Sequence, residues 1–365
     1  MDPVDPLALA RQLIDIESTT GNEGEVAEWL ANFLRGLGYS VLEQPLEDIR
    51  LKADTTGGLG QPTSQQVVSG FSRMDRKPRR NVIAAVGEPD VVFSTHFDCV
   101  PPFFPSRVEG AVLYGRGACD AKGILAAQVA AAERLRANGE TRVGLVFVGG
   151  EERGSDGAKA ANRIASKSRF LINGEPTDLR LGAATRGAFR VRLTAAGKAA
   201  HSGYPELGES AIDKLIDCLV ALRSAAWPSD PLLGTTHFTV GLISGGVAPN
   251  VISPHAEAEV FFRTVGEHAP VRQVLHNALA GRVTVEEILE LPAMRMHTVP
   301  GFETAVFSYF SDIPFLSNWG TPLLLGPGSI HVAHTEREQI AIDELNRAVE
   351  IYTALAAKLL GGNDK

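Results

Sequence analysis

The chain has 365 residues, of which 44 % are hydrophobic and 21 % are charged. This composition permits a sizeable core and argues against disorder or a fibrous repeat, and the length corresponds to about two domains. The 43 acidic residues outnumber the 35 basic ones, for a net charge of −8, which disfavours binding to a phosphate backbone, so no nucleic-acid partner is expected.

The cysteine content and the N-terminal residues predict a cytoplasmic protein. Three cysteines are too few to form a disulfide scaffold in a chain of this length, so reduced thiols are expected. The acidic residues 1–5 lack the basic and apolar regions of a signal peptide. Apolar runs such as 143–148 are far shorter than the roughly 20 residues of a membrane helix, so no membrane association is expected.

Helix and strand patterns alternate along the first 182 residues. Residues 23–37 place Val26, Leu30 and Leu34 on one helical face, and Asn22 with Glu25 three positions later predicts a capping box. The further elements are strands at 81–86, 91–95, 143–148 and 170–173, with helices at 122–136 and 157–165. This alternation predicts an α/β domain with a mixed, mostly parallel sheet.

A different pattern begins near residue 184. Phe189, Val191 and Leu193 alternate with polar residues, as in a strand with one solvated face. The next elements are a helix at 210–223, strands at 236–243 and 255–263, a helix at 270–279 and a strand at 283–289. The order strand-helix-strand-strand-helix-strand predicts an inserted ferredoxin-like α+β domain over residues 183–294.

The C-terminal region is predicted to return to the first domain. It contains an apolar strand at 322–325 and a long helix at 343–360. The predicted catalytic domain is therefore discontinuous and comprises residues 1–182 and 295–365. Residues 54–80 read as an exposed loop, with a substrate-gating segment as the alternative.

Acidic and imidazole residues occupy predicted strand ends or glycine-rich turns of the first domain. They are His96, Asp98, Asp120, Glu151, Glu152, Glu175 and His334. Each has an ordinary explanation when taken singly, such as a surface histidine or a solvated pair of glutamates. Their joint placement at the carboxyl edge of a parallel sheet favours an enzyme site, and these ligand types suit zinc or a similar ion. A dinucleotide loop at Gly115 and Gly117 is disfavoured, because Asp120 occupies the place of a third glycine.

A family resemblance rests on six motifs that occur in order. They are HFDCVPP, YGRGACDAKG, GGEERGSDGA, NGEPT, GKAAHSG and LGPGSIHVAH. The set resembles the zinc aminoacylase and carboxypeptidase superfamily, which includes acetylornithine deacetylase, succinyl-diaminopimelate desuccinylase and glutamate-releasing carboxypeptidases.

The resemblance implies two divalent metal ions, zinc or alternatively cobalt. It implies that His96 and Glu175 bind one ion, that Glu152 and His334 bind the other, and that Asp120 bridges them. Asp98 would orient the imidazole of His96. Glu151 would be the general base that takes a proton from metal-bound water and delivers it to the leaving nitrogen.

The inserted domain contributes further residues to this resemblance. His201 would polarise the scissile carbonyl, in some relatives from a partner subunit, and the chain would form a homodimer through this domain. Asn250 and Arg263 would bind the substrate carboxylate, and Arg186 is a looser match to a substrate contact.

Three functional hypotheses follow. The first is a deacetylase acting on an N-acyl amino acid such as N-acetylornithine or N-acetylcitrulline, as in arginine biosynthesis, because residues 325–329 resemble that type. The second is a dipeptidase, carboxypeptidase or succinyl-diaminopimelate desuccinylase on the same scaffold. The third is a non-catalytic metal-binding protein, which the free base Glu151 argues against.

Overall fold

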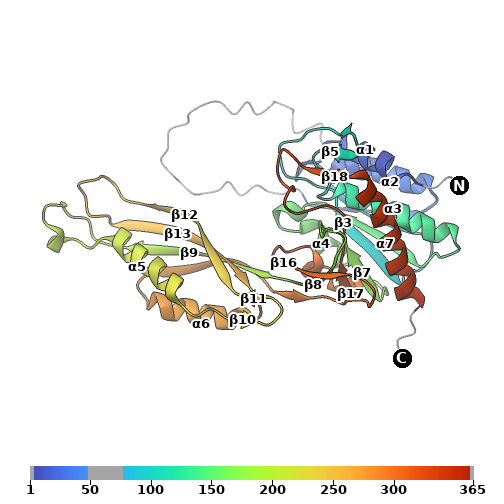
Figure 1. Ribbon diagram of the computed structural model, residues 1–365. Helices are drawn as coiled ribbons and strands as arrows, with labels where there is room; N and C mark the ends of the chain where they lie inside the picture. Colours follow the sequence, from blue (N-terminus) through green and yellow to red (C-terminus); the bar gives the residue numbers. More distant parts are fainter. Residues whose placement is uncertain (1–3, 48–76, 362–365) are drawn as a thin grey trace. The chain divides into compact units, whose positions relative to one another are not determined.

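The computed structural model describes residues 4–47 and 77–361 (Figure 1). Most of the predicted loop at 54–80 lies outside these residues. The chain divides into two compact units. Unit 1 comprises Met1–Leu181, His297–Glu303 and Ser311–Lys365, and unit 2 comprises Gly182–Met296 and Thr304–Phe310. The return of residues 304–310 to unit 2 has no counterpart in the predicted domain boundaries.

Unit 1 is built on a six-stranded mixed sheet, as predicted. Its strand order is β1 (Ser40–Pro45), β2 (Arg80–Ala85), β6 (Val143–Val148), β3 (Val91–His96), β7 (Phe170–Asn173) and β17 (Thr321–Leu324). β3 runs parallel to β6 and β7, and β17 runs parallel to β7. The remaining pairs, β1 with β2 and β2 with β6, are antiparallel. β3 and β6 are buried along their whole length, as expected for the centre of a layered sheet.

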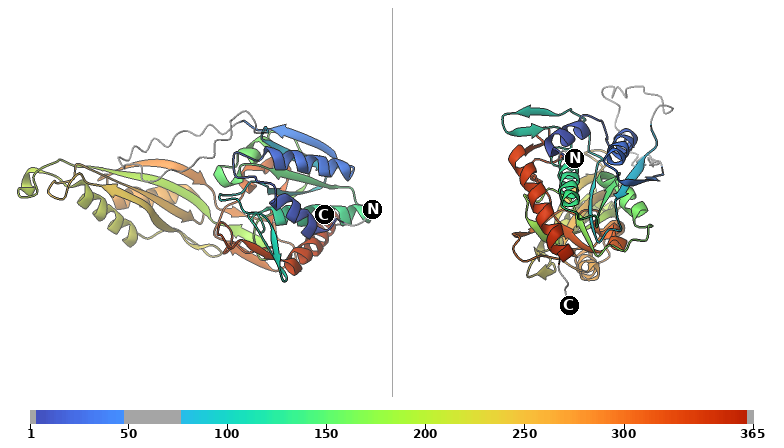
Figure 2. Two further views of the ribbon diagram at one scale, coloured as in Figure 1. Left: turned by 90° about the horizontal axis from the view of Figure 1, so that it is seen from above. Right: turned by 90° about the vertical axis from the view of Figure 1, so that its right-hand side faces the viewer.

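Helices cover both faces of this sheet. They are α1 (Pro6–Ile14), α2 (Gly24–Gly36), α3 (Lys122–Ala137), α4 (Asp156–Ala161) and α7 (Ile342–Gly361). α3 packs beside both α1 and α7 (Figure 2). Successive side chains of β3 point to opposite faces, so Phe93 joins the large core beneath these helices while Val92 packs in the smaller core with Trp319.

Two local predictions in unit 1 are wrong, and one helix is absent from the predicted elements. The Asn22 capping box is wrong, because α2 begins after Glu23 with no side-chain cap; the Glu23 carboxylate instead pairs with Arg79. α4 ends at Ala161, well before residue 165. α1 was not predicted, although Asp5 caps it and Pro6 occupies its first turn.

Unit 2 contains the predicted ferredoxin-like sandwich. Its elements are β9 (Gly187–Ala196), α5 (Ala211–Ser224), β12 (His237–Gly245), β13 (His255–Thr264), α6 (His268–Leu279) and β14 (Thr284–Leu291). The sheet order is β12-β13-β9-β14 and every pair is antiparallel. Phe189, Val191 and Leu193 are buried against α5 and α6, as the alternation in β9 predicts.

Short strands complete the structure. One sheet joins β15 (Met294–Arg295), β8 (Leu181–Thr185) and β16 (Thr304–Phe307), and another joins β18 (Gln339–Ala341), β5 (Val112–Tyr114) and β4 (Arg107–Glu109). β10 (Ser229–Asp230) pairs with β11 (Gly234–Thr235). Apart from β8, these segments have two to four residues, too few for hydrophobic periodicity to reveal them. Among the described helices, none combines the length and the apolar character required to cross a bilayer.

Candidate metal centre and active site

The predicted site residues of unit 1 meet at the carboxyl edge of its sheet. His96 is the last residue of β3, and Glu151 and Glu152 lie in the 3-10 turn η1 (Glu151–Arg153) that follows β6. Glu175 comes two residues after β7. Because these three strands are adjacent and parallel, their carboxyl ends bring the side chains together.

His96, Asp120 and Glu152 form the centre of this cluster. Each offers one ligand atom, and these atoms lie within 4.8 Å of one another. The Nε2 atom of His96 lies 3.0 Å from Asp120 Oδ1, and the Nε2 atom of His334 lies 3.2 Å from Asp120 Oδ2. His334 Nε2 is also 3.0 Å from the Glu152 carboxylate. The Asp120 carboxylate therefore has one oxygen toward each imidazole, which is the arrangement that a bridging ligand needs.

Glu175 lies beside this trio. Its Oε1 atom is buried and has no hydrogen-bond partner in the described part of the chain. Burial raises the pKa of Glu175 well above its usual range, an effect that the neighbouring His96 opposes. A buried acceptor without a donor is costly, and a cation beside it would remove that cost.

The residues present fit a divalent metal. Two imidazoles and several carboxylates are the donor set of zinc and related first-row ions. Glu151, Glu152 and Glu175 all have raised pKa values, with burial as the main cause. Burial thus disfavours the ionised carboxylates, and a divalent cation beside them would stabilise their ionised forms.

Asp98 links His96 to the turn that carries Glu151 and Glu152. The Nδ1 atom of His96 faces the backbone carbonyl oxygen of Asp98 at 3.0 Å, which leaves Nε2 for the ligand position. The Asp98 carboxylate accepts hydrogen bonds from the backbone N–H groups of Glu151 and Glu152, at 3.0 and 3.3 Å. Thr20 donates a further hydrogen bond to it at 2.7 Å. Asp98 therefore fixes both the imidazole of His96 and the start of η1.

Glu151 has the environment of a general base. It is buried, and it follows Gly150, whose φ of 83° allows the chain to turn sharply out of β6. Burial, together with the negative charge of Glu175, raises the pKa of Glu151 well above its usual range. A carboxylate of raised pKa beside a metal site is suited to accept and release a proton near neutral pH.

His334 occupies a strained loop position. Its φ is 62°, in the left-handed region that residues other than glycine rarely adopt. Hydrogen bonds to Asp120 and Glu152 raise the pKa of His334 to about 10. Such backbone strain is concentrated at functional sites, where the surrounding contacts maintain it.

Unit 2 holds the other predicted residues. His201 and Asn250 are both exposed, and they lie close together because residues 201 and 251 form a β-bridge and Ser202 N–H donates to the carbonyl oxygen of Asn250. Arg263 has a buried Nη1 atom without a hydrogen-bond partner in the described regions. The Nη1 atom of Arg186 is already engaged, because it donates to the carbonyl oxygen of Thr235 at 2.7 Å.

Comparison with known proteins agrees with this geometry. The sequence profile described as Peptidase family M20/M25/M40 matches residues 92–358. A protein of Aspergillus fumigatus named "Probable carboxypeptidase" is 34 % identical over 389 aligned residues, which cover 96 % of this chain and 85 % of the relative. The chain belongs to the M20 peptidase family. Its narrower likeness to acetylornithine deacetylases stays a prediction.

Solved structures share the fold of this M20 chain. The aminopeptidase PepT of Bacillus cereus superposes with a TM-score of 0.74 at 20 % identity and covers 98 % of both chains. The YXEP protein of Bacillus subtilis, described as a dinuclear metal-binding peptidase of the M20 family, superposes with a TM-score of 0.66 at 15 % identity and covers 97 % of both chains. The predicted α/β fold class is confirmed.

Three buried charged residues beside the M20 site were not predicted. Glu338 and Arg116 form a buried ion pair next to the Asp120 loop. Asp312 is buried with neither carboxylate oxygen hydrogen-bonded within the described residues, and burial raises its pKa to about 6. Sequence spacing gives little signal for such residues, because burial rather than a local pattern distinguishes them.

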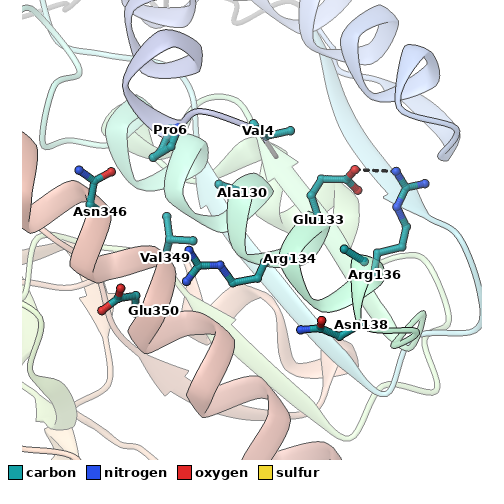
Figure 3. A pocket seen from close by; sticks show the side chains of 11 residues that line it. Val4, Pro6, Ala130, Glu133, Arg134, Arg136, Asn138, Asn346, Val349 and Glu350 are labelled. Carbon is teal, nitrogen blue, oxygen red and sulfur yellow. Dashed lines mark hydrogen bonds and ion pairs between the residues drawn. The ribbon is translucent and has the colours of Figure 1, made fainter. Parts of the chain in front are cut away.

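The metal centre is distinct from a cavity of about 750 Å³ in unit 1 (Figure 3). That cavity is lined by α3 and α7 residues that include Glu133, Arg134 and Glu350. Glu133 is ion-paired with Arg136 at its rim. No residue of the metal cluster lines it, so the cavity has no direct part in the chemistry of the metal centre.

Proposed function

We propose that this M20 chain is a metal-dependent exopeptidase, a dipeptidase or carboxypeptidase, that hydrolyses the amide bond preceding a free carboxylate. The observation that carries the proposal is the Arg263 guanidinium, whose buried Nη1 has no partner in the described regions of unit 2. The guanidinium lies over the Phe261 ring, and its free buried N–H group is suited to a planar carboxylate. The name of the fungal relative, a carboxypeptidase, supports the same activity.

We further propose that the site binds two divalent ions, zinc in the first place. His96 and Glu175 would hold one ion, Glu152 and His334 the other, and Asp120 would bridge them. The dinuclear character stated for the Bacillus subtilis relative supports this assignment. When bound, the ions supply Lewis acidity that polarises a carbonyl group and acidifies water.

The chain's own residues then divide the remaining work. Glu151 takes a proton from the attacking water and returns it to the leaving nitrogen, so that the products are a free amine and a carboxylic acid. Asp98 holds the His96 imidazole and the turn that carries Glu151 in position. In this proposal His201 donates a hydrogen bond to the oxygen on which negative charge develops, and Asn250 and Arg263 bind the substrate carboxylate. Arg186 supports this carboxylate-binding region through its hydrogen bond to the carbonyl oxygen of Thr235.

A substrate panel tests the proposal. It contains dipeptides, longer peptides with free or amidated C-termini, N-acetylornithine, N-acetylcitrulline and succinyl-diaminopimelate, each assayed with added zinc. We expect peptides with a free C-terminus to be cleaved and their amides to be poor substrates. Arg263→Met should remove this preference mainly by raising KM. Turnover of the N-acyl amino acids alone would overturn the exopeptidase assignment and restore the deacetylase.

We also propose a homodimer formed through unit 2. β12 is an edge strand, and Leu242, Ile243 and Val247 on and after it are 65 %, 61 % and 73 % exposed. The opposite edge, β14, carries the charged residues Glu286, Glu287 and Glu290, which discourage strand pairing. An apolar edge strand can pair with a second copy of itself about a two-fold axis.

Mixing two inactive variants tests the dimer and the role of His201 together. Glu151→Gln and His201→Ala are each expected to be nearly inactive. If His201 acts on the partner subunit's substrate, random re-pairing gives mixed dimers with one complete site, and about a quarter of the wild-type activity returns. Light scattering would first establish the mass. A monomer contradicts the dimer, and a dimer without recovered activity contradicts action across subunits.

A further inference from the structure

Glu338 is a buried carboxylate that lies outside the proposed ligand set yet contacts the loop of a ligand. It is 1 % exposed. Its Oε1 atom accepts hydrogen bonds from the backbone N–H groups of Gly117, Cys119 and Asp120, at 2.9, 3.3 and 3.2 Å. A single side chain thus gathers three backbone donors from the loop that presents the Asp120 carboxylate.

Arg116 completes this arrangement. Its Nη1 atom lies 2.6 Å from Glu338 Oε2 and 3.2 Å from the carbonyl oxygen of Thr335. Its Nε atom donates to the carbonyl oxygen of Pro102 at 3.2 Å. Arg116 is 2 % exposed, so the pair is shielded from water and each charge depends on the other.

The same contacts fix the loop of a second ligand. His334 lies four residues before Glu338, and Thr335, which follows His334, is bonded to Arg116. Backbone bonds reinforce the junction, because Gly115 N–H donates to the carbonyl oxygen of Glu338. Asp120 and Glu338 are 218 positions apart in sequence, so the hydrogen bond between them joins two segments that local interactions could not hold together.

We propose that Glu338 and Arg116 are positioning residues that set the distance between Asp120 and His334, and thereby the affinity and geometry of the metal centre. This inference rests on the proposed metal centre. Neither residue contacts the metal or the substrate in this proposal; they act through the backbone of the two ligand loops. The strained φ of His334 is consistent with a loop whose ends are fixed by other contacts.

The carboxylate of Glu338 is specifically required. One carboxylate oxygen accepts hydrogen bonds from three backbone N–H groups, and the other accepts one from the Arg116 guanidinium. Both oxygens must therefore act as acceptors. In Glu338→Gln one of these positions becomes an NH₂ group that faces another donor. The variant keeps the size of the side chain, but it loses either the hydrogen bond from Arg116 or those from the three backbone N–H groups.

The test measures metal binding without using activity. Wild type, Glu338→Gln and Arg116→Lys are stripped of metal and titrated with zinc against a chromophoric chelator, and their Co²⁺ forms are compared by visible absorption. We expect both variants to bind zinc about ten- to a hundredfold more weakly, as is typical when a partner of a metal ligand is lost, and to show altered cobalt bands. Thermal unfolding of the metal-free forms is recorded in parallel.

Glu133→Gln is the matched control. Glu133 is also a carboxylate paired with an arginine and accepts a hydrogen bond from Tyr39 at 2.8 Å, but it lies eleven residues beyond Lys122 along α3. We expect it to change unfolding without changing zinc affinity. Unchanged zinc affinity and cobalt bands in both test variants would overturn the positioning role while leaving the proposed function intact. Wild type that binds no zinc would overturn both, and if Glu338→Gln does not fold, Arg116→Lys decides.

Discussion

Glu151→Gln is expected to lower kcat by about 10²- to 10⁴-fold, the usual contribution of a positioned general base. The amide occupies the same volume as the carboxylate but cannot accept the proton of the attacking water. Because Glu151 is not among the proposed ligands, the zinc content should stay at the wild-type value, and KM should change little. Steady-state kinetics with a substrate from the panel, together with elemental analysis of the purified protein, measures both quantities.

The adjacent residue provides the contrast. Glu152 carries a carboxylate 3.0 Å from His334 Nε2 and belongs to the ligand trio, so Glu152→Gln should lose metal as well as activity. The two neighbouring substitutions would thus lower activity for different reasons, loss of the general base at position 151 and loss of metal at position 152. Activity retained in Glu151→Gln would contradict the general-base role, and metal loss in that variant would show that Glu151 is a ligand.

The fold follows from the sequence where patterns are long or strongly apolar. The fully apolar β6 and the strict alternation in β9 each predict their burial correctly, and together with the intervening helices they give both the mixed sheet and the ferredoxin-like unit. The two- and three-residue strands lack such periodicity. Helix α1 has an apolar face formed by Leu9, Leu13 and Ile14, but it is absent from the predicted elements. At α2, the expected Asn22 cap is overridden by a tertiary contact, because Arg79 pairs with Glu23 at the helix start.

The site was predictable only as far as strand ends reveal it. His96 and Glu152 follow buried parallel strands, so sheet topology alone brings them close together. Asp120 and His334 lie in loops, where their residue types mark them as candidates and the motif resemblance indicates their roles. Glu338 and Asp312 carried no sequence signal, because their importance comes from burial and from backbone contacts across the chain. The assignment of individual roles to these residues stays a proposal.

Removing the metal is expected to abolish activity and to lower the stability of unit 1. Asp120, Glu151 and Glu175 are buried carboxylates, and without a cation they repel one another in a region that solvates charge poorly. If zinc is present at a thousandfold excess over its Kd, its binding stabilises the folded state by about 4 kcal/mol. Dialysis against a chelator should therefore lower Tm, and added zinc should restore both Tm and activity.

Asp120→Asn should resemble the metal-free protein at every zinc concentration, since the bridging ligand is lost. Full activity after verified metal removal would contradict the metal-dependent mechanism.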